Sequence, residues 1–241
     1  MNVFAIEPTN HCNAYCGFCP WPTATHDRPR GFMSLDTLAR ILALISSDTV
    51  AINGLGEPLI HKQCDEIVRR FTEQGVRTQL NSNGLLLNQK WYDRLLAAGL
   101  SRLIVTADYH PWGEKQIDTD PALPLELYCI TREEEGHIHK ELDDWAGQVG
   151  SSSRPDVPCS FIYDDWYQIQ WNGDVLRCCA DFNGTHKLGN IHGQWVPGGR
   201  KGRGIPLCAQ CHGYHFTNAL VMGDYTGEEG NATPEHLLQI E

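Results

Sequence analysis

The sequence contains no long hydrophobic run. No stretch of its 241 residues approaches the ~20 uninterrupted apolar residues that a membrane-spanning helix needs. The first residues, Met-Asn-Val-Phe-Ala-Ile-Glu, also lack the basic segment and the apolar core of a signal peptide. We therefore expect a protein that stays in the cytoplasm and has no membrane partner. The sequence also shows no internal repeats.

Positive charge is scarce. The chain has 19 Lys and Arg against 30 Asp and Glu, a formal net charge of −11. Nucleic-acid binding needs basic surface to meet the phosphates, so we expect no nucleic-acid partner. The acidic excess fits a cationic substrate, although solubility is the simpler explanation. With 241 residues, the chain can form one elaborated domain, or one domain with a small second one.

Cysteine, in contrast, is plentiful, with ten in the chain. In the reducing cytoplasm such thiols are more often metal ligands or catalytic groups than disulfides. Three of them, Cys12, Cys16 and Cys19, lie on one tight loop. Their x3 and x2 spacing can hold three corners of a cubane [4Fe-4S] cluster and leave the fourth iron free. Because structural zinc sites and most cluster sites use four protein ligands, this incomplete set indicates a cofactor on the fourth iron.

Strand and helix patterns alternate through the first half of the chain at the spacing of a parallel α/β sheet. Strands are expected at residues 2–7, 49–53, 77–80, 103–106 and 125–131, and helices at 34–45, 64–74 and 89–98. Ser34 is expected to be an N-cap, and Gly75 and Gly99 are expected to end the second and third helices. The cysteine loop follows the first strand, where α/β folds build their sites. The pattern predicts a partial (β/α) barrel.

The second part of the chain is rich in Trp, Tyr, Gly and Cys. Residues 167–171 and 175–178 flank the turn Asn172-Gly173-Asp174, which predicts a β-hairpin. A Gly/Ser/Pro linker at 150–155 separates this region from the barrel. We therefore expect a barrel domain at 1–150, a second domain at 151–222 and a loosely structured tail at 223–241.

Four cysteines of the second region form another candidate metal site: Cys159, Cys178, Cys208 and Cys211. The Cys208-x2-Cys211 pair is a two-ligand chelate, and Cys178 ends the predicted hairpin. Four thiolates close a metal site. The residues alone leave two alternatives open, an iron–sulfur cluster or a structural zinc site, the latter with or without His212 or His215.

The pattern C-x3-C-x-aromatic-C, completed by Phe18, closely resembles the motif of the radical S-adenosylmethionine (radical SAM) superfamily. The resemblance implies that SAM chelates the unique iron and that one electron from the cluster cleaves SAM to a 5′-deoxyadenosyl radical. It also implies a one-electron reductant, such as flavodoxin or ferredoxin, as partner. Phe18 is expected to pack near the adenine, with a core position as the alternative.

Three further segments resemble SAM-binding segments of this superfamily, and each follows a predicted strand. They are 54–58 (Gly-Leu-Gly-Glu-Pro), 81–84 (Asn-Ser-Asn-Gly) and 106–108 (Thr-Ala-Asp). The resemblance implies that Glu57 accepts a hydrogen bond from the SAM amine. The cofactor-binding residues that it implies are Phe18, Gly56, Glu57, Ser82, Asn83 and Asp108. Ordinary turn chemistry at strand ends is the alternative reading of each segment alone.

The cysteine-bearing segments of the second region resemble the Twitch form of the SPASM extension. The segments are 158–159, 173–181, 188–190 and 207–211. The resemblance implies a C-terminal domain of β-hairpin plus helix, with one auxiliary [4Fe-4S] cluster held by four cysteines. The metal ligands expected for the second cluster are Cys159, Cys178, Cys208 and Cys211, and the chain would then carry two [4Fe-4S] clusters.

Three cysteines belong to neither set: Cys64, Cys129 and Cys179. Cys64 and Cys129 lie in apolar patterns and are expected in the core. Cys179 adjoins Cys178, where the second domain is expected to face the barrel. Radical SAM epimerases use a cysteine as hydrogen donor, so Cys179 is the candidate catalytic residue, with a packing role as the alternative.

The leading hypothesis from these residues is a radical SAM epimerase. It would abstract a carbinol hydrogen from a sugar, aminocyclitol or aminoglycoside-type substrate, and Cys179 would return a hydrogen. The second hypothesis is a dehydrogenase that oxidises the same carbinol to a ketone. The resemblance to small Twitch enzymes, and the lack of room for a leader-recognition domain before residue 2, favour a small polar substrate. A peptide-modifying radical SAM enzyme and a non-enzymatic zinc module are further alternatives.

Overall fold

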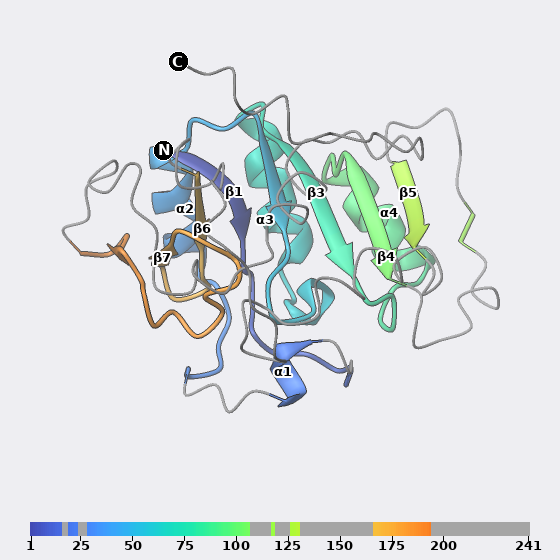
Figure 1. Ribbon diagram of the computed structural model, residues 1–241. Helices are drawn as coiled ribbons and strands as arrows, with labels where there is room; N and C mark the ends of the chain where they lie inside the picture. Colours follow the sequence, from blue (N-terminus) through green and yellow to red (C-terminus); the bar gives the residue numbers. More distant parts are fainter. Residues whose placement is uncertain (16–18, 24–27, 107–116, 119–125, 131–165, 194–241) are drawn as a thin grey trace, which may run out of the picture.

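The computed structural model describes residues 1–15, 19–23, 28–106, 117–118, 126–130 and 166–193 (Figure 1). The side chains of residues 22–23, 106 and 126–130 are outside this description. The expected linker at 150–155 and the expected tail at 223–241 also lie outside the described residues, and so does most of the second region. The fold below concerns the described part of the chain.

An eight-stranded sheet organises these residues, in the order β5-β4-β3-β2-β1-β6-β7-β8. Its strands are β1 (Asn2–Ile6), β2 (Thr49–Ile52), β3 (Arg77–Ser82), β4 (Arg102–Thr106), β5 (Glu126–Ile130), β6 (Trp166–Ile169), β7 (Asp174–Leu176) and β8 (Gly189–Asn190). Strands β1 to β5 are parallel, β6 is parallel to β1, and β7 and β8 are antiparallel additions. The expected α/β fold with a mostly parallel sheet is confirmed.

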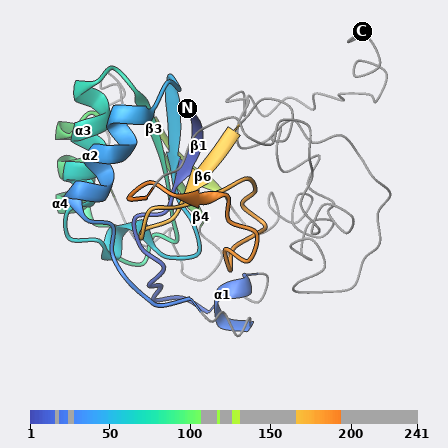
Figure 2. The ribbon, with the colours of Figure 1, turned by 90° about the vertical axis from the view of Figure 1, so that its left-hand side faces the viewer.

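Helices α2 (Leu35–Leu44), α3 (Cys64–Glu73) and α4 (Gln89–Ala97) cover one face of the sheet (Figure 2). Their ends lie within a residue or two of the predicted ones. The short α1 (Pro20–Thr23) lies beyond the carboxyl ends of the parallel strands (Figure 1), and a 3₁₀ turn, η1, spans Pro58–Ile60. Neither was predicted, because a single turn is too short to show a hydrophobic period. Among the described residues, no helix is long and apolar enough to cross a membrane.

The residues expected to begin and end the helices do so in the structure. The hydroxyl oxygen of Ser34 accepts a hydrogen bond from the Thr37 amide at 3.0 Å, as an N-cap does. Gly75 and Gly99 follow α3 and α4 with φ of 74° and 84°, a left-handed conformation that other residues adopt only with strain. Local sequence therefore sets where these helices begin and end.

The main core lies between the helices and the sheet. Val50 and Ile52 of β2 face the helix side and are fully buried there. Cys64 is buried in this core, as expected. A second, smaller cluster consists of Phe4, Ala5 and Ala51, with Trp166 and Cys179 packed against it. Since side chains alternate along a strand, Ala51 lies on the face opposite Val50 and Ile52. Cys179 therefore packs on the sheet face opposite α2, α3 and α4.

The β6–β7 hairpin belongs to the same sheet as the barrel strands. Val3 pairs with Tyr167 and Ile6 with Ile169, and the Glu7 amide donates a hydrogen bond to the Ile169 carbonyl at 2.8 Å. The sequence predicts the hairpin but places it in a separate second domain. The parallel pairing was missed because it joins segments far apart in the chain and leaves no local sequence signal. Strands β6 to β8 thus extend the sheet of β1 to β5, while the domain boundary expected at residue 150 lies outside the described residues and stays a prediction.

Asp174 stabilises the turn of this hairpin and makes it sensitive to acid. Its carboxylate accepts hydrogen bonds from Asn190 (2.9 Å), Asn172 (3.0 Å) and Lys187 (3.2 Å). Burial alone would raise the pKa of Asp174, but the bonds from Asn190, Asn172 and Lys187 outweigh it and lower that pKa. The stability it contributes is thus present above the unfolded pKa of about 3.9 and is lost as the pH falls through the folded value.

We expect Asp174→Asn to lower the melting temperature at neutral pH. The difference from wild type should narrow as the pH falls from about 5 toward about 2, because both carry a neutral side chain there. Thermal denaturation followed by circular dichroism measures this. Asp93→Asn, at an exposed position of α4, is the matched control. A difference that stays constant with pH would contradict the assigned role.

Candidate functional site

The cysteine loop lies beside the loops that follow β2 and β3. The Glu57 amide donates a hydrogen bond to the His11 carbonyl at 2.8 Å. The Asn83 amide group donates to the Asn13 side chain at 2.9 Å and approaches the Cys12 sulfur at 3.8 Å. The carboxyl ends of three neighbouring parallel strands therefore meet at one place, as expected for an α/β site.

Gly56 permits the close approach of two of these loops. A Cβ at this position would lie 2.1 Å from the carbonyl oxygen of Thr9 and 2.7 Å from that of His11. Both neighbours are backbone atoms, which cannot turn aside as a flexible side chain would. The requirement for glycine at the third position of segment 54–58 is thus steric, and this close approach holds the cysteine loop against the end of β2.

Cys12 and Cys19 are half-buried and pack against Trp21, Leu55 and Phe182. Burial raises the pKa of Cys12 and raises that of Cys19 to about 11. Without a cation both thiols hold their protons at neutral pH, and a bound metal would displace those protons. The Trp21 amide donates to the Cys19 sulfur at 3.5 Å, an N–H···S contact that suits a cluster thiolate. The two thiols and their donors therefore fit an iron–sulfur cluster. Cys16 and Phe18 lie outside the described residues.

Glu57 holds the loops after β2 and β3 together. Its side chain is 2% exposed. One carboxylate oxygen accepts from the Leu59 amide (3.0 Å) and the Ser82 hydroxyl (2.8 Å), and the other accepts from the Asn83 amide (2.7 Å). Burial raises the pKa of Glu57, and these three bonds oppose the rise. The structure thus gives Glu57 an internal role that the sequence did not predict. Its contact with the SAM amine stays a prediction.

Ser82 and Asn83 complete this arrangement. The Ser82 hydroxyl also accepts from the Gly84 amide at 3.0 Å, and the Asn83 side-chain oxygen accepts from the Leu85 amide at 2.9 Å. These bonds hold the turn in shape and direct the amide group of Asn83 toward Cys12. Gly56, Glu57, Ser82 and Asn83 therefore lie around the cysteine loop, whereas Asp108 falls outside the described residues.

The segment after β7 carries Cys178 and Cys179 side by side. The Ala180 amide donates to the Cys178 sulfur at 3.3 Å. The pKa of Cys178 is raised well above its usual value, chiefly by a hydrogen bond with the Cys179 thiol and then by burial. The carboxylate of Asp181, 1% exposed, accepts from the Thr185 and His186 amides. Asp181 therefore holds the shape of the loop that follows Cys178. Cys159, Cys208 and Cys211 lie outside the described residues.

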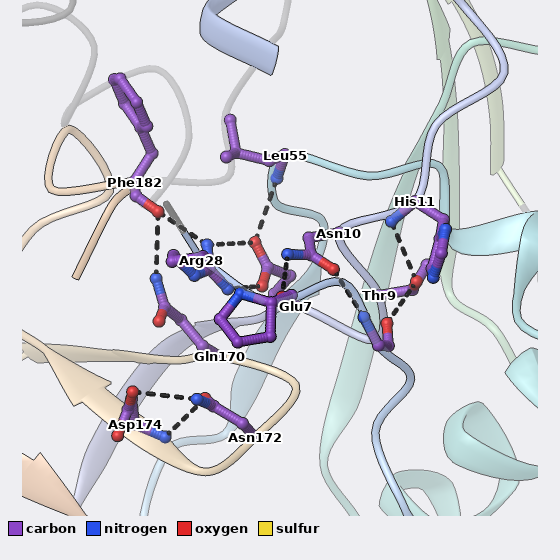
Figure 3. A network of polar contacts seen from close by, with 12 residues as sticks. Glu7, Thr9, Asn10, His11, Arg28, Leu55, Gln170, Asn172, Asp174 and Phe182 are labelled. Carbon is purple, nitrogen blue, oxygen red and sulfur yellow. Dashed lines mark hydrogen bonds and ion pairs between the residues drawn. The ribbon is translucent and has the colours of Figure 1, made fainter. Parts of the chain in front are cut away.

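A buried ion pair near both cysteine segments was not predicted from the sequence. The Arg28 guanidinium pairs with the Glu7 carboxylate and donates to the Phe182 carbonyl at 2.6 Å (Figure 3). Gln170 also donates to that carbonyl, at 3.3 Å. The partners are far apart in the chain and share no motif, so no spacing could have revealed them. The one available signal is a carboxylate, Glu7, that directly continues an apolar strand.

Two family models match the chain. Residues 6–110 match the Radical SAM superfamily, and residues 159–196 match SPASM, an iron–sulfur cluster-binding domain. The first match spans the cysteine loop and the loops after β2 and β3, and the second spans the β6–β7 hairpin and Cys178. SAM and a [4Fe-4S] cluster accompany the first, and an auxiliary iron–sulfur cluster accompanies the second. These expected cofactors are confirmed, and iron is favoured over the zinc alternative.

Curated proteins similar to this chain fall into two groups. The AdoMet-dependent heme synthase of Methanosarcina barkeri is 34% identical over 109 residues, and a GTP 3′,8-cyclase of Pelotomaculum thermopropionicum is 32% identical over 114. The matches cover 44% and 45% of this chain but only 31% and 34% of those proteins, about a third of their length. The S-adenosyl-L-methionine-dependent 2-deoxy-scyllo-inosamine dehydrogenase of Niallia circulans is 23% identical over 212 residues, which is 81% of this chain and 80% of that protein.

Among solved structures, BtrN in complex with AdoMet and 2-DOIA aligns with a TM-score of 0.62 at 21% identity, covering 80% of this chain and 79% of BtrN. An open conformation of BtrN gives a TM-score of 0.54 at 19% identity, covering 95% and 90%. At this identity the likeness shows the fold alone. It confirms the expected α/β fold with a mostly parallel sheet.

Proposed function

Because this chain is a radical SAM protein with a SPASM iron–sulfur cluster-binding domain, we propose that it is a dehydrogenase of a small polyhydroxylated substrate. It removes the hydrogen from a secondary carbinol carbon of a sugar or aminocyclitol and releases a ketone. The observation that carries this proposal is the similarity to 2-deoxy-scyllo-inosamine dehydrogenase over 81% of the chain. That similarity favours oxidation over the epimerisation that the sequence analysis placed first.

The reaction balances without an added oxidant. When bound at the first cysteine loop, SAM and its cluster supply a 5′-deoxyadenosyl radical. The substrate carbon would give its hydrogen atom to the 5′ carbon of this radical. The substrate would then lose the hydroxyl proton and return one electron to the iron–sulfur clusters, which offsets the electron used to cleave SAM. One alcohol and one SAM yield one ketone, one methionine, one 5′-deoxyadenosine and one proton. A one-electron reductant, such as flavodoxin or ferredoxin, starts the cycle.

The residues around the cysteine loop support this chemistry by holding their loops rigidly. Glu57 ties the turn of Ser82 and Asn83 to the end of β2, and Asn83 faces the Cys12 sulfur. We assign SAM-binding roles to the set that the motifs imply: Phe18, Gly56, Glu57, Ser82, Asn83 and Asp108. The first cluster is assigned to Cys12, Cys16 and Cys19. A [4Fe-4S] auxiliary cluster is assigned to Cys159, Cys178, Cys208 and Cys211.

Epimerisation is the second candidate, and the placement of Cys179 favours it. Cys179 is half-buried beside Cys178 and packs against Phe4, Ala5 and Ala51 on the sheet face opposite α2, α3 and α4. A thiol there can give its hydrogen atom to a substrate carbon radical, so that the S–H bond breaks and a C–H bond forms. The resulting thiyl group then needs one electron and one proton from the reductant before the next turnover.

Replacement of Cys179 by alanine separates the two reactions. For a dehydrogenase, we expect Cys179→Ala to keep ketone formation within about threefold of wild type, because no hydrogen returns to the substrate. The assay uses anaerobically reconstituted protein with SAM, a reductant and a panel that includes 2-deoxy-scyllo-inosamine, and it measures ketone and 5′-deoxyadenosine by mass spectrometry. Cys64→Ala, which removes a thiol from the main core, is the matched control.

The same assay in deuterated water identifies the outcome that would overturn the dehydrogenase. An epimerase would release a product with one deuterium at the inverted carbon, delivered from the exchangeable thiol. Loss of that product in Cys179→Ala, with 5′-deoxyadenosine still formed, would establish epimerisation in place of oxidation. Equal amounts of ketone and 5′-deoxyadenosine in wild type would establish oxidation.

A further inference from the structure

The ion pair of Arg28 and Glu7 joins three segments that serve the two cysteine sites. Glu7 directly follows β1 and leads into the first cysteine loop. Arg28 lies in the chain that leaves α1, just after that loop. Phe182, whose carbonyl accepts from Arg28 at 2.6 Å, lies four residues after Cys178 (Figure 3). One guanidinium therefore contacts both family-matched regions.

Burial makes this arrangement unusual. The Arg28 side chain is 9% exposed and that of Glu7 is 2% exposed. Taking two charges out of water costs about as much as their attraction returns, so a buried pair is weak evidence for stability. The planar fork of arginine does give directional bonds, here to both carboxylate oxygens and to a carbonyl. The pair is thus better explained as a device that fixes the relative positions of the segments it joins than as a source of stability.

The residues around the pair are closely packed. The Leu55 amide donates to the Glu7 carboxylate at 3.3 Å. A Cβ at Gly54 would lie 2.6 Å from Cγ of Glu7, so the backbone of the loop after β2 passes close beside the Glu7 side chain and only glycine leaves room for it. Glu7 therefore has little freedom to follow Arg28 if the arginine moves.

Phe182 connects the ion pair to both cysteine sites, through its carbonyl group and through its ring. Its carbonyl is fixed by Arg28 and Gln170, and Gln170 is 1% exposed at the end of β6. Its ring packs with Trp21 and Leu55, the same cluster against which Cys12 and Cys19 lie. The backbone that carries Cys178 is thereby held against the loop that carries the first three cysteines.

We propose that Arg28 is a positioning residue that sets the segment 178–182 at a fixed place relative to the first cysteine loop. A fixed distance between the two segments ensures that each hydrogen abstraction is followed by loss of the second electron from the substrate. This coupling between the two steps rests on the proposed function. If the segment were displaced, SAM would still be cleaved, but 5′-deoxyadenosine would form without a matching amount of ketone. We therefore expect SAM cleavage to become uncoupled from ketone formation, rather than a simple loss of activity.

The first test measures coupling as 5′-deoxyadenosine formed per ketone. The net reaction sets this ratio near one in wild type. In Arg28→Met we expect it to rise about tenfold or more, because an ångström-scale displacement of reacting groups costs orders of magnitude in rate. Arg28→Lys keeps the charge but lacks the fork, so it should fold as wild type and still show a raised ratio. Arg70→Met, which removes an exposed ion pair on α3, is the control and should match wild type.

The second test needs no substrate. In a background with Cys12, Cys16 and Cys19 replaced by alanine, the electron paramagnetic resonance spectrum of the reduced protein reports the auxiliary cluster alone. We expect Arg28→Lys to shift its g values while the iron content and the melting temperature stay close to those of the parent. Unchanged spectra and unchanged coupling in Arg28→Lys would overturn the proposal, including when Arg28→Met fails to fold. If wild type oxidises no alcohol of the panel, the proposed function fails, and the spectra still decide the role of Arg28.

Discussion

Cys12→Ala is expected to abolish SAM cleavage. Cys12 is one of three cysteines on the loop after β1, and its sulfur faces the Asn83 amide group at 3.8 Å. With this thiol removed, only two protein ligands remain for a cluster that needs three, so the site should not assemble. Iron and sulfide analysis after anaerobic reconstitution should show loss of the first cluster. Formation of 5′-deoxyadenosine should fall to the background of protein without SAM.

Cys64→Ala provides the contrast. Cys64 is fully buried on α3, within the main core rather than at the carboxyl ends of the strands. Its loss should cost on the order of 1 kcal/mol of unfolding free energy and leave iron content and SAM cleavage near wild type. A Cys12→Ala protein that keeps its full iron content and its SAM cleavage would remove the basis of the site.

Gly56→Ala is expected to have the second largest effect. The added methyl group would lie 2.1 Å from the Thr9 carbonyl oxygen and 2.7 Å from that of His11, far inside van der Waals contact. The two loops must separate, which costs about 1–3 kcal/mol of stability as overpacking does. Separation also moves the cysteine loop away from Asn83 and Glu57. Misplacement on this scale should lower SAM cleavage about a hundredfold, measured as 5′-deoxyadenosine per minute.

Gly193→Ala is the matched control for this substitution. Among the described residues, a Cβ there would meet the Asn190 carbonyl oxygen alone, at 3.6 Å, which is an ordinary contact. Its melting temperature, iron content and rate should equal those of wild type. If Gly56→Ala behaves like Gly193→Ala in all three measurements, the loops do not approach each other as closely as described.

The elements of the barrel half could be predicted because their signals are local. Ser34, Gly75 and Gly99 mark helix ends through their own backbone chemistry, and the hydrophobic periods between them span only a few turns. The pairing of β6 with β1 could not be predicted, since it depends on residues more than 150 positions apart. The single-turn α1 and η1 were too short to show a period.

The candidate site shows the same division. The cysteine motif and the three strand-end segments carry fixed spacings, so the family was predicted and then confirmed by the matched models. The hydrogen bonds of Glu57 to the loops after β2 and β3, and the ion pair of Glu7 and Arg28, depend on tertiary contacts. Such contacts join residues with no fixed spacing in the sequence. The choice between epimerisation and oxidation was also beyond the sequence, because Cys179 and an auxiliary cluster are compatible with both. The similarity to 2-deoxy-scyllo-inosamine dehydrogenase favours oxidation.

The pairing of β6 with β1 also has a consequence for biosynthesis. Strand β1 is synthesised well before its neighbour β6, which consists of residues 166–169. Such long-range parallel pairing folds slowly, and on the ribosome it must wait until β6 has been synthesised. Since the first cysteine loop continues directly from β1, we expect that loop to reach its final shape only after the hairpin has been synthesised. Both cysteine sites would then mature together after translation, and a truncated nascent chain would be a poor acceptor for iron and sulfide.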